Sequence, residues 1–289
     1  MRCRCPPASG SRPMSRGRCR TFSRTLQVFL PLFKSSLCNI CCDETFDLGK
    51  GKNKEIAKDE MDVKKLYVGF LKKIIGIDCL DLLVEQARKQ FGNEVLSFYA
   101  CDVATEDFAE KLQQIMQKEN IPAFDIIHCS FMLMHTKEQE EILRRLKAFL
   151  APGGKLIAIE PDDTTSYMNP DPDGIYREFL QVLSADPYAG KRNMGAELPG
   201  LFANSGYTDI ELECSEIASS GNEITKKEHI FDTFCSYLQE DLILLRQGAE
   251  GGAYQKEWEW VQKNFEKLRQ LMTGEASTVS MGVKIYTCG

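Results

Sequence analysis

The sequence predicts an α/β fold: a Rossmann-like, mostly parallel sheet, with an antiparallel C-terminal strand pair and a helical insertion before the last strand. Between residues 73 and 161, short apolar runs alternate with amphipathic ones, and strands that alternate with helices form parallel sheets. Several of the apolar runs end in an acidic residue. Ligands bind at the carboxyl ends of such strands, so these acids fall where a ligand would lie.

Four apolar runs are the expected strands of the parallel region. They cover residues 74–78, 96–102, 124–130 and 154–160. Amphipathic runs at 81–91, 106–117 and 137–150 are the expected helices between them, each with its apolar side chains on one face. The last of these helices is followed by Pro152-Gly153-Gly154, a strong breaker before a strand.

The pattern loosens after Glu160. Residues 161–174 read as a loop rich in Asp, Pro and Thr. Helices are expected at 175–183 and 194–205, and strand character at 207–218. Two long amphipathic helices follow, at about 226–247 and 253–271, and residues 277–287 close the chain as a strand. The insertion before the last strand therefore covers about 222–275.

The chain divides by charge into two parts. Residues 1–42 hold seven Arg and one Lys without an acid, whereas the remainder holds 28 basic and 42 acidic side chains. We expect a basic, disordered leader at 1–42 and one domain at 43–289. An Arg-rich, Ser-rich, acid-free segment has the composition of an organelle import signal. The alternative is an extension without function, in which case the protein stays in the cytoplasm.

Composition argues against several classes of protein. The net charge of −6 disfavours general nucleic-acid binding, and no apolar run approaches the roughly 20 residues that span a membrane. A chain of this length needs no disulfides, so the twelve Cys are expected as thiols in a reducing compartment. No second Cys or His pair lies at a suitable spacing from Cys38 and Cys41, so no metal site is expected.

Residues 47–289 resemble the class I S-adenosylmethionine-dependent methyltransferases that act on small molecules. Four features appear in the family's order: an acid ending the second strand (Asp78), an aspartate after the third (Asp102), a fourth strand beginning Phe124-Asp125, and a Pro-Gly-Gly before the fifth. The closing pair of strands also fits this family. The resemblance implies S-adenosylmethionine as the cofactor.

The resemblance assigns roles to residues at the strand ends. Asp78 would hydrogen-bond both ribose hydroxyls, since a carboxylate offers two acceptor oxygens. Cys79 would pack beside the adenosine. Asp102 would accept a hydrogen bond from the adenine amino group, and Val103 would supply a backbone contact. The alternative for each acid is a solvated strand end or a helix cap.

The same resemblance places Ser130 and Phe131 beside the methionine part of the cofactor. His135 occupies a position where family members often place an aromatic residue or a His close to the substrate, so it is the candidate catalytic residue. It reads equally well as a packed residue. Asp125 is expected to be structural, because it lies within its strand.

The family's glycine loop is degenerate in this sequence. The nearest match contains Asp47, Gly49 and Gly51, and Asn53 stands where a third glycine is usual. Asp47 precedes Asp78 by 31 residues, where about 20 is expected for the analogous dinucleotide-binding motif. Either the helix after the loop is longer than usual, or the first strand and loop are damaged and cofactor binding is weakened or lost. A charged loop with incidental glycines also fits.

The predicted function is methyl transfer from S-adenosylmethionine to a small-molecule acceptor by in-line displacement. The alternative is a non-catalytic methyltransferase-like binding module. A nicotinamide-dependent dehydrogenase fits less well, because the glycine motif is poor and the C-terminal pair is antiparallel. The oligomeric state does not follow from the sequence. The acceptor-side candidates are Glu160, Asp162, Tyr188, Arg192 and His135.

Overall fold

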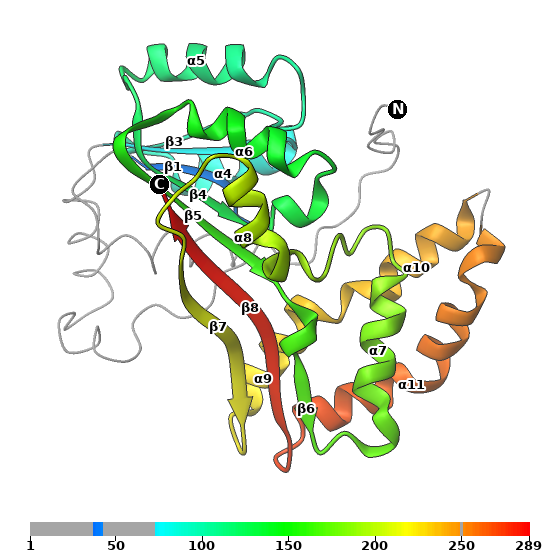
Figure 1. Cartoon of the computed structure of the whole chain (residues 1–289). Helices are drawn as coiled ribbons and strands as arrows, with labels where there is room; N and C mark the ends of the chain where they lie inside the picture. Colours follow the sequence, from blue (N-terminus) through cyan, green and yellow to red (C-terminus); the bar gives the residue numbers. More distant parts are fainter. Residues whose placement is uncertain (1–36, 43–72, 249–250) are drawn as a thin grey trace.

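The computed structural model describes residues 37–42, 73–248 and 251–289 (Figure 1). Its strands form one sheet in the order β3-β2-β1-β4-β5-β8-β6, and β7 pairs with β8. Strands β1 to β5 are mutually parallel, whereas β8 runs antiparallel to β5, β6 and β7. The strands are β1 (Leu37–Cys42), β2 (Ile74–Asp78), β3 (Leu96–Ala100), β4 (Phe124–Ser130), β5 (Leu150–Pro161), β6 (Tyr167–Asn169), β7 (Glu211–Ser220) and β8 (Thr278–Cys288).

The predicted fold class is confirmed: the sheet is mostly parallel and ends in an antiparallel pair. Two of the predicted strands, β2 and β4, have the expected bounds. The fifth strand begins earlier than expected, at Leu150, because Leu150 pairs with Phe124 before the register shifts. Gly153, with φ of 77°, bends the chain inside the strand, so the Pro-Gly-Gly motif forms an irregularity of β5.

The first strand of the sheet lies in the segment expected to be a leader. Leu37 to Ile40 pair with Ile74 to Ile77 on one side, and β4 pairs with the other side of the same strand. The sheet therefore starts before the expected boundary at residue 42. The Arg-rich composition of the flanking residues masked this short apolar run, which contains only six residues.

The helices occupy most of the expected ranges. One expected helix, at 226–247, is two helices, because Ser236 Oγ donates to Asp232 O and Ser236 N donates to Phe231 O, which interrupts the regular pattern. The α-helices are α4 (Asp81–Phe91), α5 (Phe108–Lys118), α6 (Gln139–Lys147), α7 (Ile175–Ser184), α8 (Met194–Asn204), α9 (Ile224–Phe234), α10 (Tyr237–Gln247) and α11 (Gln255–Thr273). Short 3₁₀ turns are η2 (Leu133–His135), η3 (Asp163–Thr165), η4 (Pro172–Gly174) and η5 (Gly251–Tyr254).

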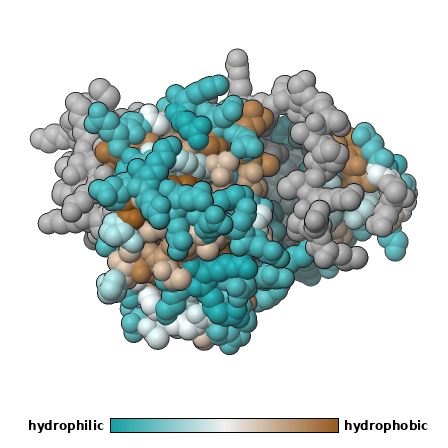
Figure 2. All heavy atoms as spheres, turned by 90° about the horizontal axis from the view of Figure 1, so that it is seen from above, coloured by the Kyte–Doolittle hydropathy of each residue, from teal (hydrophilic) through white to brown (hydrophobic). Residues whose placement is uncertain are grey.

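The helices form two groups around the sheet. Helices α4, α5 and α6 lie beside the parallel strands, whereas α7, α10 and α11 stand together on the side of β6 that faces away from β8 (Figure 1). Helix α4 packs Val84 and Ala87 on Phe98 in a small cluster, and most of the other described buried apolar side chains form one core. The face seen from above is mainly hydrophilic, with hydrophobic side chains in separate patches (Figure 2). Of the helices that the structure describes, none combines the length and hydrophobicity of a membrane crossing.

The helices between β7 and β8 are tied to the sheet by a buried lysine. Lys227 on α9 is fully buried, and its Nζ donates to the carbonyl oxygens of Gly221 at 2.8 Å, Gly274 at 2.6 Å and Ser277 at 2.6 Å. Gly221 lies before the insertion and Ser277 after it. The single ammonium group therefore joins the entrance and the exit of the helical insertion, and burial lowers its pKa.

Candidate functional site

The sheet changes direction between β1 and β4. From β2, next to β1, the chain moves outward to β3 and then returns to β4 on the other side of β1. A crevice for a ligand forms at such a switch point, at the carboxyl ends of the strands. Asp78 ends β2 and Ser130 ends β4, so the two lie on either side of this position.

The two expected ligand-binding aspartates lie on adjacent strand ends. Asp78 is half-buried; its Oδ1 accepts a hydrogen bond from Leu80 N at 2.7 Å, and its carbonyl accepts one from Cys101 N at 2.8 Å. Asp102, also half-buried, accepts from Ala104 N at 2.9 Å. Each carboxylate thus closes a local turn two residues on, as Asp side chains commonly do. Both remain partly accessible from the edge of the sheet.

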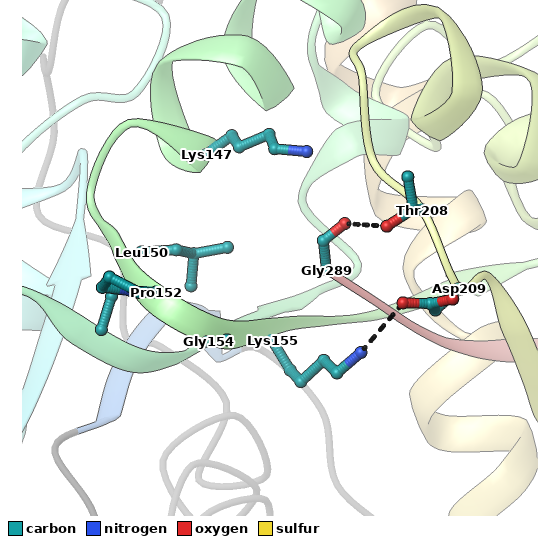
Figure 3. A pocket seen from close by; sticks show the side chains of 10 residues that line it. Lys147, Leu150, Pro152, Gly154, Lys155, Thr208, Asp209 and Gly289 are labelled. Carbon is teal, nitrogen blue, oxygen red and sulfur yellow. Dashed lines mark hydrogen bonds and ion pairs between the residues drawn. The ribbon is translucent and has the colours of Figure 1, made fainter.

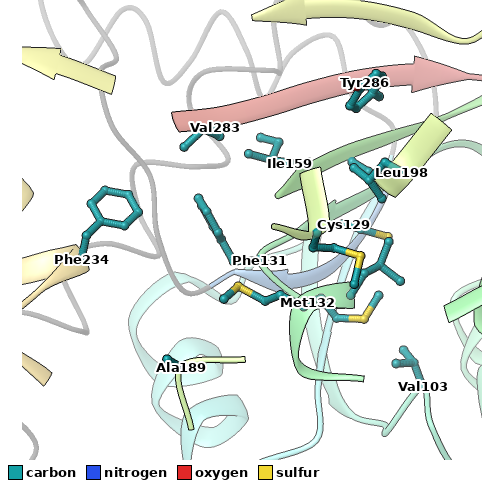
Figure 4. Packing of buried hydrophobic residues seen from close by; sticks show 14 of the residues in the cluster. Val103, Cys129, Phe131, Met132, Ile159, Ala189, Leu198, Phe234, Val283 and Tyr286 are labelled. Carbon is teal, nitrogen blue, oxygen red and sulfur yellow. The ribbon is translucent and has the colours of Figure 1, made fainter. Parts of the chain in front are cut away.

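Buried residues lie behind these acids. Ser130 is fully buried, and its Oγ has no hydrogen-bond partner among the residues that the structure describes. The next residue, Phe131, has φ of 50°, an unusual value for a residue other than glycine. Its ring packs edge-on against Phe234 of α9, with ring centroids 6.0 Å apart (Figure 4). Val103 is buried in the same core.

A buried carboxylate holds the turn that follows β4. Glu160, near the end of β5, is fully buried. Its Oε1 accepts from Met132 N at 3.0 Å and Leu133 N at 2.7 Å, and its Oε2 accepts from Met134 N at 3.3 Å. Burial raises the pKa of Glu160 to about 8, although the three N–H donors act to lower it. The Glu160 side chain therefore binds the backbone of the turn.

The two acids that follow β5 also have partners. Asp163 pairs with Arg192 through two contacts of 3.0 Å, and the side chains of both residues are almost fully buried. Asp162 lies 3.5 Å from the ammonium of Lys284 on β8. Arg192 also donates to the hydroxyl of Tyr237 at 3.5 Å. These contacts join the turn after β5 to β8, to the loop before α8 and to α10.

His135 lies at the surface, at the end of η2. A Cβ added to Gly190 would lie 2.8 Å from His135 Nδ1 and 2.8 Å from Met134 O. Gly190 has φ of 71°, and Lys191 N donates to Met134 O at 2.8 Å. The loop between α7 and α8 is therefore packed directly against the turn that carries His135.

The remaining expected site residues are placed as follows. Asp47, Gly49 and Gly51 lie outside the described residues. Cys79 is exposed beside Asp78, and Tyr188 is exposed on the loop between α7 and α8. Phe231 and Phe234, on a helix of the insertion, are buried in the core.

A cavity of about 480 Å³ lies at the opposite edge of the sheet (Figure 3). Its lining includes the first residues of β5 and the loop before β7. The polar groups there contact one another: Thr208 Oγ1 donates to Gly289 O at 3.1 Å, Lys155 Nζ lies 4.0 Å from Asp209, and Lys147 donates to Gly206 O. This cavity is distant from the carboxyl ends of β2 and β4, so it is separate from the candidate site.

The strand order defines a Rossmann-like domain, and the acids at the carboxyl edge mark a candidate ligand site at its switch point. Residues 68–156, less than half of the chain, match the family model described as a methyltransferase domain. Over this part of the chain, the match supports the resemblance to methyltransferases. No curated protein matches the sequence.

Several solved structures are similar to this chain. A proposed methyltransferase from Bacillus halodurans C-125 is 13% identical, over 91% of this chain and 96% of that one, with a TM-score of 0.46. The YcgJ protein from Bacillus subtilis is 12% identical, over 91% and 95%, with a TM-score of 0.45. Phosphoethanolamine N-methyltransferase 2 from Haemonchus contortus, solved with S-adenosyl-L-methionine, is 13% identical, over 91% and 50%, with a TM-score of 0.41. The likeness of this chain to methyltransferases rests on the strand order and the family match.

Proposed function

We propose that this protein transfers the methyl group of S-adenosylmethionine to a small-molecule acceptor by in-line displacement. The observation that carries the proposal is the position of Asp78, half-buried at the carboxyl end of β2, which is separated from the switch point by β1 alone. The buried Oγ of Ser130, on the other side of that point, has no partner within the described part of the chain, which fits a polar ligand.

Different candidate residues would bind different parts of the cofactor. Asp78 would accept hydrogen bonds from the ribose hydroxyls, with Cys79 beside the adenosine, and Asp102 and Val103 would hold the adenine. Ser130 and Phe131 would line the methionine part. Asp47, Gly49 and Gly51 are the further candidates for cofactor binding that the resemblance implies. The bound cofactor supplies a methyl group on a sulfonium with a good leaving group.

The chain's own contribution to the reaction is alignment of the acceptor and exclusion of water. His135 lies at the acceptor side, next to the loop between α7 and α8, and is the candidate for removing a proton from the acceptor. Such a base is optional, because its need depends on the acceptor atom. Import into an organelle through the Arg-rich N-terminus, rather than residence in the cytoplasm, also remains a proposal.

Cofactor binding is tested by thermal unfolding with S-adenosylhomocysteine. At about 100 times the Kd, a ligand stabilises a protein by about 2.7 kcal/mol, which corresponds to a rise in Tm of roughly 5–10 °C for a domain of this size. We expect this rise in the unaltered protein and its loss in Asp78→Ala. Asp209→Ala, which removes an exposed acid near the distant cavity, should keep the rise.

The alternative reading predicts a different result. A methyltransferase-like module that has lost its cofactor through the degenerate glycine loop would show no shift at millimolar S-adenosylhomocysteine. Isothermal titration with S-adenosylhomocysteine and with NAD separates both readings from a nicotinamide-dependent enzyme. Binding of NAD alone would contradict the proposed function.

A further inference from the structure

Glu160 is buried and contacts three successive backbone N–H groups. The oxygens of its carboxylate lie 3.0, 2.7 and 3.3 Å from the nitrogens of Met132, Leu133 and Met134. No cation is among the contacts described for it. A buried carboxylate is costly unless hydrogen-bonded, so this arrangement ties the end of β5 firmly to the turn after β4.

The turn held by Glu160 carries two residues of the candidate site. Phe131 immediately precedes it, in the left-handed region of φ. Such a conformation is strained for a residue other than glycine and persists only where the surroundings enforce it. Phe131 N also donates to Ile159 O at 2.8 Å, next to Glu160 on β5. His135 ends the turn and meets Gly190.

The same turn is in contact with the helical insertion and the loop between α7 and α8. Phe131 touches Phe234 of α9, and Met134 O accepts from Lys191 N at 2.8 Å. A change in the conformation of the turn would therefore move Phe131 on the cofactor side and His135 on the acceptor side. Glu160 fixes the position of the turn between Phe131 and His135.

We propose that Glu160 is a positioning residue for methyl transfer: its carboxylate fixes the 132–134 turn, and thereby places Phe131 against the methionine part of the cofactor and His135 against the acceptor. This inference rests on the proposed function. In this proposal Glu160 affects the reaction by holding the turn in place, and it does not contact the acceptor.

Glu160→Gln tests the inference, with S-adenosylhomocysteine as the probe. An amide offers only one acceptor oxygen, so at least one of the three N–H groups loses its partner. We expect hydrogen exchange of the 132–134 amides to accelerate at least about tenfold, while the amides of β5 and β8 keep their protection. We also expect the Kd, measured by isothermal titration, to rise about tenfold or more.

Two further variants complete the test. Glu160→Asp keeps the charge but shortens the side chain, and should weaken binding in the same direction if the amide variant does not fold. Asp171→Asn is the matched control, because Asp171 likewise accepts from two backbone N–H groups, those of Tyr176 at 2.8 Å and Arg177 at 3.4 Å, at the start of α7. Its Kd should stay within about twofold of the unaltered protein.

The outcomes separate the two proposals. If the unaltered protein binds S-adenosylhomocysteine and Glu160→Gln binds it equally well with a loosened turn, Glu160 is merely structural and the inference is overturned. Unchanged exchange at 132–134 would overturn it as well. If the unaltered protein does not bind the probe, the proposed function fails and the inference fails with it.

Discussion

His128 and Glu160, on the neighbouring strands β4 and β5, are buried titratable residues whose pKa values are displaced in opposite directions by one cause. Burial disfavours the charged form of each side chain. It lowers the pKa of His128 to about 4 and raises that of Glu160 to about 8. Burial therefore opposes ionisation of both side chains in the folded protein, and each makes stability depend on pH.

His128→Gln should remove part of the acid sensitivity of the fold. Because the pKa of His128 falls from 6.5 to about 4 on folding, its contribution is complete above pH 6.5 and is lost as the pH falls toward 4. The full effect is about 3 kcal/mol. Gln retains hydrogen-bonding groups but does not titrate, so urea unfolding should show a flatter dependence of stability between pH 6.5 and 4.

The difference in stability between the unaltered protein and His128→Gln gives the contribution of His128 alone. The contribution of Glu160, whose pKa is raised, is present below pH 4.5 and is lost as the pH rises through about 8, and it is common to both proteins. His229→Gln, at an exposed position on α9, is the control and should leave the pH dependence unchanged. A constant difference in stability from pH 6.5 to 4 would contradict the prediction.

Strand β8 has to pass very close to the 3₁₀ turn after β5. A Cβ at Gly282 would lie 2.1 Å from Asp162 O and 2.2 Å from Thr165 Oγ1. The backbone of Gly282 also accepts from Asp162 N at 2.8 Å and donates to Ser166 Oγ at 2.8 Å. Glycine is required here by close approach, because the strand and the turn share this space.

Gly282→Ala should lower the free energy of unfolding by about 3 kcal/mol, at the upper end of the usual cost of overpacking, since the obstructing atom belongs to the backbone. Gly200→Ala on α8 is the matched control, because nothing lies within 4 Å of the added Cβ. It should leave stability unchanged or raise it by about 0.5–1 kcal/mol. Urea unfolding of the two variants measures both, and equal stabilities would refute the argument.

The whole sheet depends on a strand that lies far from the predicted parallel region in sequence. Strand β1 pairs with β2 on one side and with β4 on the other. Its position is central, so β2 and β3 reach the rest of the described sheet only through it. The integrity of the molecule should therefore depend on residues 37–42.

Two truncated chains test this dependence. A chain starting at residue 37 keeps β1 and should unfold cooperatively. A chain starting at residue 43 leaves the facing backbone groups of β2 and β4 without partners and should lose the cooperative transition. Circular dichroism during heating measures the difference. A cooperative transition in the shorter chain would instead support the leader expected at 1–42.

The sequence by itself determined the fold class, the bounds of β2 and β4, and the presence of Asp78, Asp102 and Ser130 at strand ends, because these depend on local patterns of hydrophobicity. Only the tertiary structure decided the rest. Strand β1 became recognisable through its two partners, and the role of Glu160 through backbone groups 26 to 28 residues away. Contacts between residues so distant along the chain leave no periodic signal, since the folded sheet alone brings them together.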